Sequence, residues 1–142
     1  MRVALGADHG GFRLKEVIKQ HIGRQDIEVT DFGTDSPEAV DYPDFAQMVG
    51  RAVADGAADF GILVCGTGIG MAIAANKTPG IRAALCTDSY MARMSRQHND
   101  ANILALGERV IGEGVALDIV ENFLSSDFER GRHAARVGKI RG

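Results

Sequence analysis

Short, continuously apolar runs alternate along this chain with longer stretches in which apolar residues recur every three or four positions. The run Phe60-Gly61-Ile62-Leu63-Val64 is of the first kind, which is typical of a strand buried on both faces. Residues 12–22 are of the second kind and indicate an amphipathic helix, closed by Gly23. Strands are predicted at 2–7, 27–32, 60–64, 81–86 and 102–106, and helices at 12–22, 43–56, 68–76, 89–97 and 112–124.

This alternation determines the fold class. Strands joined through helices of about ten or more residues cannot pair as hairpins, and right-handed crossovers then give a parallel sheet with helices on both faces. We therefore predict an α/β fold: a three-layer, Rossmann-like (flavodoxin-like) domain with a five-stranded parallel sheet, spanning residues 1–142. The segment from about 127 to 142 follows the last predicted element, and we expect it to form a C-terminal helical arm rather than a second domain.

In sheets of this kind, ligands bind beyond the carboxyl ends of the strands. Candidate acids, bases and anion-binding groups follow all five predicted strands. They are Asp8, His9 and Gly10; residues 33–35; residues 65–70; Thr87 and Asp88; and residues 107–109. We expect the functional site at this edge of the sheet.

Composition and charge narrow the functional class. The net charge of −3 argues against a nucleic-acid partner, because neutralising several phosphates requires a basic face. No apolar stretch approaches the roughly 20 residues of a membrane-spanning helix, and the first apolar run is too short for a signal peptide. Cys65 and Cys86 lie in apolar runs without Cys-x-x-Cys spacing, which favours a reducing compartment. We expect a cytoplasmic protein with neither a nucleic-acid nor a membrane partner.

The junction at Cys65 carries the strongest chemical signal. Here an apolar run ends in a thiol and is followed by Gly66-Thr67-Gly68-Ile69-Gly70, directly before a predicted helix. A thiol can act as a base, and backbone N–H groups at a helix start can hold an oxygen on which negative charge develops. By itself the pattern also fits a buried structural cysteine beside a tight glycine turn.

Cofactor and metal motifs are not matched. A dinucleotide-binding fingerprint needs a third glycine where Met71 stands, and a P-loop needs a Lys-Ser/Thr pair that does not follow Gly70. The four histidines lack the spacing of zinc ligands, and no carboxylate cluster suggests Mg²⁺. We therefore expect chemistry without a metal or a cofactor.

Two polar segments towards the C-terminus are further candidates. His98 lies in a polar turn with Asn99 and Asp100, which could orient its imidazole for proton transfer near neutral pH; such a histidine can equally be a surface or capping residue. Arg132 and Arg136 are four residues apart, so on a helix they project from one face and could grip a phosphate. A basic cluster of this kind also fits a solvated helix face.

Seven motifs extend over essentially the whole chain. They are Asp8-His9-Gly10-Gly11-Phe12-Arg13-Leu14-Lys15, Asp41-Tyr42-Pro43, Cys65-Gly66-Thr67-Gly68-Ile69-Gly70-Met71, Ala74-Ala75-Asn76-Lys77, Gly80-Ile81-Arg82-Ala83, Ser95-Arg96-Gln97-His98-Asn99-Asp100-Ala101-Asn102 and Gly131-Arg132-His133. In this order they resemble the B-type ribose-5-phosphate isomerase family, which is grouped with the galactose-6-phosphate isomerase subunits. The resemblance implies a metal-free interconversion of ribose 5-phosphate and ribulose 5-phosphate, a step of the pentose phosphate pathway.

The resemblance also implies a role for each matching residue. Cys65 would move a proton between C2 and C1 of the open-chain sugar, and Thr67 would assist proton exchange on the substrate oxygens. His98, helped by Asp8, would open the furanose ring. The backbone of Gly66, Gly68, Ile69 and Gly70 would hold the enediolate, Asn99 would bind sugar hydroxyls, and His9, Arg109, Arg132 and Arg136 would bind the phosphate.

The same resemblance implies a homodimer or a dimer of dimers with composite active sites, the two C-terminal arginines reaching into the neighbouring subunit. Two other functions stay open. One is the isomerisation of another phosphorylated sugar, such as allose 6-phosphate, galactose 6-phosphate or a tetrulose phosphate. The other is a small-ligand-binding module without catalysis.

Overall fold

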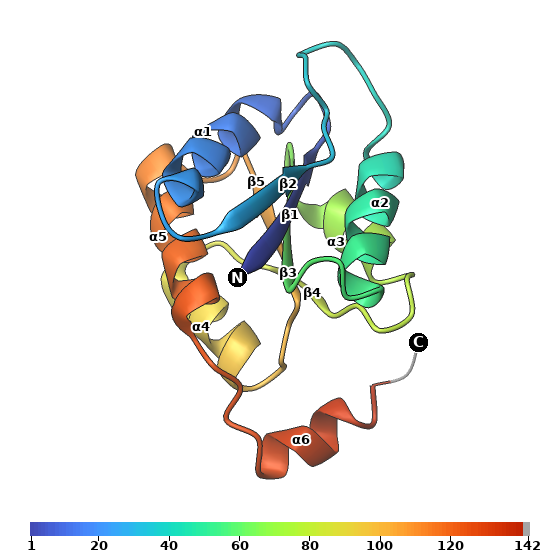
Figure 1. The fold of residues 1–142 in the computed structure, drawn as a ribbon, viewed down its shortest axis with the longest axis vertical. Helices are drawn as coiled ribbons and strands as arrows, with labels where there is room; N and C mark the ends of the chain where they lie inside the picture. Colours follow the sequence, from blue (N-terminus) through green and yellow to red (C-terminus); the bar gives the residue numbers. More distant parts are fainter. Residues whose placement is uncertain (141–142) are drawn as a thin grey trace.

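The computed structural model describes residues 1–140 and contains one five-stranded sheet (Figure 1). The strands are β1 (Arg2–Ala7), β2 (Glu28–Asp31), β3 (Phe60–Cys65), β4 (Ala83–Leu85) and β5 (Ile103–Gly107). Every neighbouring pair is parallel, as the long helical connections require. The predicted α/β fold class and the five strands are confirmed, with ends that differ by at most two residues.

The strand order is β2-β1-β3-β5-β4. It keeps the first three positions of the flavodoxin order, 2-1-3-4-5, and exchanges the last two. The short β4 takes the edge, whereas the fully buried β5 pairs with β3. From β1 the chain adds β2 on one side, and it then crosses back to add β3 on the other side of β1. The strand order therefore switches between β1 and β3, and the loops after these two strands meet where doubly wound sheets bind their ligands.

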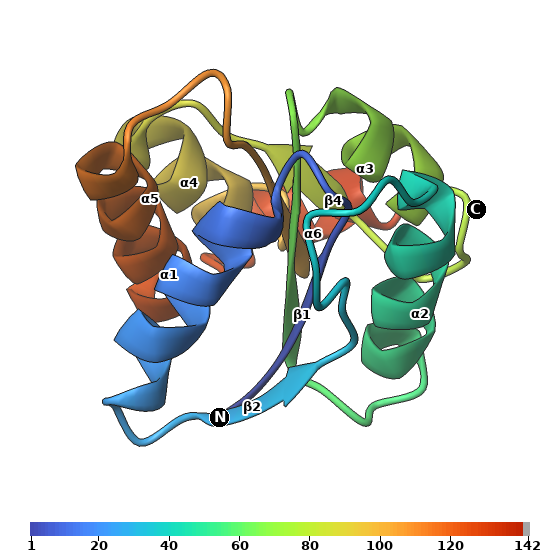
Figure 2. The same cartoon turned by 90° about the horizontal axis from the view of Figure 1, so that it is seen from above.

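Helices cover both faces of the sheet (Figure 2). On one face lie α1 (Phe12–Gly23), α4 (Ser89–Gln97) and α5 (Glu113–Ser125), and on the other α2 (Tyr42–Ala54) and α3 (Ile69–Ala75). These helices confirm the five that the periodicity predicts. Pro43 stands in the first turn of α2, and the Asp88 side chain caps α4 by accepting a hydrogen bond from the Met91 N–H over 2.8 Å.

Alternate strand residues point to opposite faces, so each face of the sheet has its own core. Ile62 and Leu104 belong to the core under α1, α4 and α5, whereas their neighbours Leu63 and Ile103 belong to the core under α2 and α3. Cys65 lies two positions beyond Leu63 and falls in the second core. The thiol at the end of β3 therefore faces the helix that its own loop leads into.

A buried lysine ties α1 to β2. Lys15 is 1% exposed, and its Nζ donates hydrogen bonds to Asp31 over 2.7 Å and to Glu16 over 2.8 Å. Lys19 also donates to Asp31, over 3.0 Å. Burial alone would raise the pKa of Asp31, but hydrogen bonds from Lys15, the Gly33 N–H and Lys19 outweigh it and hold that pKa below its ordinary value. This network fixes the edge strand against the first helix.

After α5 the chain passes through an irregular segment, 126–131, to the short helix α6 (Arg132–Val137). Figure 1 shows α6 beyond the end of the sheet at which the strands begin, opposite the loops at their carboxyl ends. This is the helical arm expected from about residue 127; Arg141 and Gly142 lie outside the described residues. Within residues 1–140, no helix is long and apolar enough to cross a membrane.

Candidate active site

The loop after β3 holds the Cys65 sulfur against a backbone amide. The Gly68 N–H donates a hydrogen bond to Sγ of Cys65 over 3.1 Å. Gly68 has a φ of +81°, and a Cβ there would lie 2.9 Å from the carbonyl carbon of Leu106, so this turn requires glycine. The turn brings a hydrogen-bond donor to the sulfur and leaves a row of glycine amides beside it.

Thr67 is exposed on the same loop. Its Oγ1 accepts a hydrogen bond from the Ile69 N–H over 3.2 Å, which leaves the hydroxyl hydrogen available to a ligand. Gly70 packs against the ring of Tyr42, where a Cβ would come within 2.6 Å of Cε1. Tyr42, 40% exposed, is thus an aromatic neighbour of the loop that is absent from the predicted set of site residues.

The segment that follows β5 fixes this loop in place. The Glu108 N–H donates to the Cys65 carbonyl and the Arg109 N–H to the Gly66 carbonyl, both over 3.0 Å. The Arg109 guanidinium lies over Gly66, where a Cβ would come within 3.1 Å of Nη1. Because Arg109 is exposed, it presents its positive charge beside the glycine amides.

The loop after β1 approaches the end of β3 closely. A Cβ on Gly11 would lie 2.3 Å from the Val64 carbonyl oxygen, an approach that only glycine allows. Asp8 is buried, and its Oδ1 accepts hydrogen bonds from the Gly10 and Gly11 N–H groups over 2.8 and 3.2 Å. One carboxylate oxygen therefore holds the loop, and the other is left for a ligand.

His9 is tied to the segment before α2. Its Nδ1 accepts a hydrogen bond from the Val40 N–H over 3.1 Å. An amide N–H can only donate, so the lone pair lies on Nδ1 and the hydrogen of the neutral ring lies on Nε2. The exposed ring therefore offers an N–H donor to a ligand. The resemblance predicted His9 as a ligand of the phosphate, but nothing in the sequence predicted its contact with Val40.

The predicted site residues fall into two groups on opposite edges of the sheet. α4 starts after the carboxyl end of β4 and runs back, so the turn at its end precedes β5 and lies at the amino edge. Arg132 and Arg136 are exposed on α6, beyond the same edge. We call Asp8, His9, residues 65–70 and Arg109 the carboxyl-edge group, and His98, Asn99, Arg132 and Arg136 the amino-edge group.

A buried arginine shapes the turn 98–102. The guanidinium carbon of Arg96 lies 4.7 Å from the ring centre of Phe60 and 5.9 Å from that of Phe123. Its Nη1 donates to Oδ1 of Asp100 over 2.9 Å. Asp100 has a φ of +47°, so this contact holds a backbone conformation that a non-glycine residue seldom adopts.

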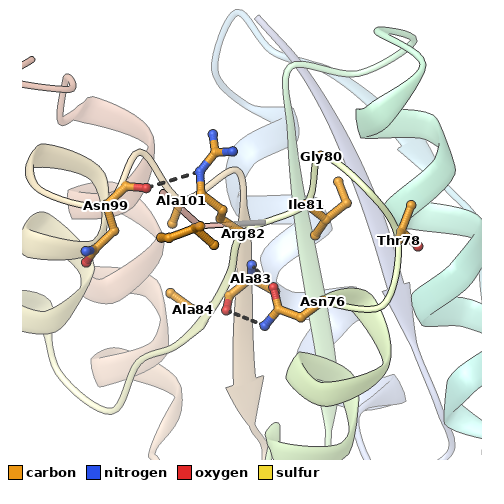
Figure 3. A pocket seen from close by; sticks show the side chains of 10 residues that line it. Asn76, Thr78, Gly80, Ile81, Arg82, Ala83, Ala84, Asn99 and Ala101 are labelled. Atoms are coloured by element: carbon orange, nitrogen blue, oxygen red, sulfur yellow. Dashed lines mark hydrogen bonds between the residues drawn. The ribbon is translucent and has the colours of Figure 1, made fainter. Parts of the chain in front are cut away.

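A cavity of about 510 Å³ lies at the amino edge, between the connection from α3 to β4 and the turn 98–102 (Figure 3). The Arg82 Nε donates to the Asn99 carbonyl over 3.2 Å, while the Asn99 side chain points away from the guanidinium (Figure 3). Asn99 lines this cavity, and its exposed side-chain amide stays available to a ligand.

His133 of α6 stacks on His98. The two ring centres are 4.2 Å apart and the ring planes differ by 9°. Oε1 of Glu129 lies 3.7 Å from Nε2 of His98 and 3.5 Å from Nε2 of His133. Burial, together with His98 and Arg132, lowers the pKa of His133 below its ordinary value, and Glu129 opposes that shift.

A metal ion is one possible ligand of His98, Glu129 and His133. Their potential ligand atoms lie within 4.8 Å of one another, and within residues 1–140 this is the one group of such side chains. The imidazole lone pairs lie in the ring planes, however, and in nearly parallel rings they do not converge on one point. The positive charges of Arg132 and Arg136 also act on His133 and disfavour a further positive charge there. The arrangement is a stacked pair rather than a formed zinc site.

Sequence comparisons agree with one another. Residues 3–140 match the family model described as Ribose/Galactose Isomerase. Ribose-5-phosphate isomerase B of Escherichia coli is 51% identical over 139 residues, which cover 98% of this chain and 93% of the relative. A putative sugar phosphate isomerase of Bacillus subtilis is 50% identical over 141 residues, which cover 99% of this chain and 95% of the relative.

Solved structures have the same fold. Ribose-5-phosphate isomerase B of Clostridium thermocellum superposes with a TM-score of 0.98 at 61% identity, covering 99% of this chain and 95% of that one. Ribose-5-phosphate isomerase B of Mycoplasma genitalium with bound ribulose-5-phosphate superposes with a TM-score of 0.95 at 40% identity, covering 98% of this chain and 93% of that one.

Proposed function

Because the chain belongs to the ribose/galactose isomerase family, we propose that it interconverts ribose 5-phosphate and ribulose 5-phosphate in the cytoplasm, as a step of pentose phosphate metabolism. The names of its relatives support this substrate, and the Mycoplasma genitalium protein holds ribulose-5-phosphate. The observation that carries the proposal is the Cys65 sulfur, held by the Gly68 N–H at the switch point of the sheet beside Arg109.

Cys65 is the base in this proposal. As a thiolate it takes the proton from C2 of the open-chain aldose, and the electron pair moves to form an enediolate with negative charge on O1. The amides of Gly66 and Gly70 meet that charge without reorganisation, while the Gly68 N–H stays on the Cys65 sulfur. The Thr67 hydroxyl assists proton exchange between O2 and O1, and Cys65 returns a proton to C1 to give the ketose. The step needs neither a metal nor a cofactor.

Ring opening and phosphate binding use the other groups. Ribose 5-phosphate is mainly a furanose, so a proton must leave the C1 hydroxyl and another must reach the ring oxygen before C2 can react. His98 does this work with Asp8, and Asn99 binds sugar hydroxyls. The phosphate is held by the Nε2–H of His9 and by Arg109, Arg132 and Arg136, whose planar guanidinium groups suit its oxygens.

We infer that the complete site contains two subunits. Within one chain, His98 and Cys65 lie at opposite edges of the sheet and cannot act on one sugar. A homodimer solves this problem if the amino-edge group of one subunit faces the carboxyl-edge group of its partner. Each dimer then has two composite sites, and every site takes His98, Asn99, Arg132 and Arg136 from the neighbouring subunit.

Turnover of ribose 5-phosphate by protein treated with a chelator tests the activity. Cys65→Ala should lower kcat on the order of 1,000-fold, the contribution of a general base, while KM changes little. The matched control is Cys86→Ala, which removes the other cysteine. If the chelated protein does not turn over, the metal-free reaction is wrong; if Cys65→Ala retains wild-type kcat, the base lies elsewhere.

The length of the sugar is a separate question. The family model names both ribose and galactose, so kcat/KM should be compared for ribose 5-phosphate, allose 6-phosphate and galactose 6-phosphate. The proposal expects the highest value for the five-carbon sugar.

A further inference from the structure

The stack between His98 and His133 joins two parts of the chain that each carry site residues. His98 ends α4, whereas His133 lies in α6 of the C-terminal arm, one residue after Arg132 and three before Arg136. His133 is only 7% exposed, although both neighbouring arginines are exposed. The helix that presents the two arginines to solvent therefore turns its histidine inward, onto the face of the His98 ring.

The contact is anchored by the backbone. The Glu129 N–H donates to the Gln97 carbonyl over 3.0 Å, directly before His98, and the His133 N–H donates to the Arg130 carbonyl over 3.0 Å. The arm is thus fastened to the end of α4 beside the stack. The ring of His133 cannot move away from His98 unless the start of α6 moves with it.

We propose that His133 is a positioning residue, whose ring holds the His98 imidazole in the orientation that sugar ring opening requires. The proposal rests on the ring-opening role of His98 set out above. It makes the arm a single element that both grips the phosphate, through Arg132 and Arg136, and fixes the proton-transferring imidazole.

The need for such a residue follows from the exposure of His98. Its side chain is 40% exposed, and Glu129, its one near polar partner among residues 1–140, lies 3.7 Å away, beyond hydrogen-bond distance. An imidazole held so weakly would rotate about two torsions and rarely point at the sugar. A stacked aromatic face restricts that rotation without occupying either ring nitrogen, so both remain free for proton transfer. Loss of the face should lower ring opening about tenfold.

Two reactions of the same protein separate this role from a general structural one. Ribulose 5-phosphate cannot form a furanose, because the C5 oxygen that would close the ring carries the phosphate. In D₂O, a hydrogen at C1 of ribulose 5-phosphate exchanges for deuterium, which we call wash-in. This exchange needs the thiol, the enediolate and the groups that bind the phosphate, but no ring opening. Conversion of ribose 5-phosphate needs all of these and ring opening as well.

The experiment measures both reactions for wild type, His133→Ala, His133→Phe and His98→Asn, with His21→Ala as a histidine control outside the site. His133→Ala should convert ribose 5-phosphate about tenfold more slowly and keep near-wild-type wash-in. His133→Phe, which keeps an aromatic face, should restore conversion. His98→Asn should show the same split in stronger form.

Each of the following results would overturn the inference. If His133→Ala equals wild type in both reactions, the stack has no role in catalysis. If His133→Ala loses both by the same factor, His133 serves the fold or phosphate binding instead. His133→Phe could convert as slowly as His133→Ala, which would show that the ring face is not the cause. If His98→Asn loses deuterium wash-in together with conversion, the ring-opening role of His98 fails and the inference falls with it. If His98→Asn loses conversion but keeps wash-in, whereas His133→Ala shows no such difference between the two reactions, only the inference about His133 is refuted.

Discussion

Gly11→Ala should damage catalysis far more than it damages the fold. The new Cβ would lie 2.3 Å from the Val64 carbonyl oxygen, whereas ordinary contacts begin at 3.4 Å, so the loop and the strand must separate by about 1 Å. β3 is a central strand, and the loop that carries Asp8 and His9 is the part that can move. The substitution therefore shifts these two side chains relative to Cys65.

The magnitude follows from that displacement. A misplacement of about 1 Å between reacting groups costs on the order of 100-fold in rate. Overpacking at one position costs about 1–3 kcal/mol of stability, which a folded domain usually survives. We therefore expect kcat/KM for ribose 5-phosphate to fall about 100-fold in a protein that still unfolds cooperatively.

The assay compares kcat/KM and urea unfolding of Gly11→Ala with those of Gly23→Ala. Gly23 ends the same helix, and a Cβ there meets nothing within 4 Å, so this control should keep wild-type activity. It should also be slightly more stable, by about 0.5–1 kcal/mol, because alanine favours the helix. Wild-type kcat/KM in a folded Gly11→Ala protein would refute the reasoning, since the close approach of the two loops would then have no catalytic purpose.

Three further substitutions test other parts of the structure. Burial raises the pKa of the Cys86 thiol to about 11, so this thiol is no base near neutral pH; Cys86→Ala should keep kcat/KM and lose about 1 kcal/mol of stability in urea, and a large loss of kcat would contradict its structural role. The lowered pKa of Asp31 means that its contribution to stability is present above its ordinary value of 3.8 and is lost as pH falls through the lower, folded value. Unfolding free energies measured from pH 7 to pH 2 should therefore show wild type and Asp31→Asn converging in acid, and a constant difference would exclude this titration. Arg109→Ala should raise KM about 10- to 100-fold, the value of a charged hydrogen bond, with a smaller change in kcat; an unchanged KM would remove Arg109 from the phosphate site.

The central strands were the most predictable part of the fold. β1, β3 and β5 are buried along nearly their whole length, so their sequences are continuously apolar and their ends could be placed within a residue. β4 was predicted at 81–86 and spans Ala83–Leu85. The first residues of the predicted range lie outside the observed strand. There the Arg82 N–H donates a hydrogen bond to the side-chain Oδ1 of Asn102 over 2.8 Å. Its position at the sheet edge depends on long-range pairing that no local pattern carries.

The carboxyl-edge group could be predicted because each member follows a strand. His98 was predicted only in a polar turn before the fifth strand, and its place at the opposite edge was not predicted, although a helix that returns from the carboxyl edge must end there. The stack of His133 on His98 had no such signal, because the irregular segment 126–131 decides where α6 lies. The contact of His9 with Val40 also depends on an irregular loop, so neither contact follows from periodicity.

The central claim is that Cys65 of one subunit acts together with His98 of its partner. Mixing Cys65→Ala with His98→Asn protein, each nearly inactive alone, tests it directly. In a mixed dimer, one site combines both changes and the other has every group intact. Random exchange makes half of all dimers mixed, so activity should recover to about a quarter of the wild-type value.

The control mixture is Cys65→Ala with Arg109→Ala. Both changes lie in the carboxyl-edge group, so no mixed dimer gains an intact site. At substrate concentrations far below the wild-type KM, activity should therefore not rise above the residual activity of the Arg109→Ala subunits. Exchange is confirmed in both mixtures by mass spectrometry of differently tagged subunits. Recovery to about a quarter in the first mixture and none in the second is the predicted result; confirmed exchange without recovery in the first would contradict the composite site.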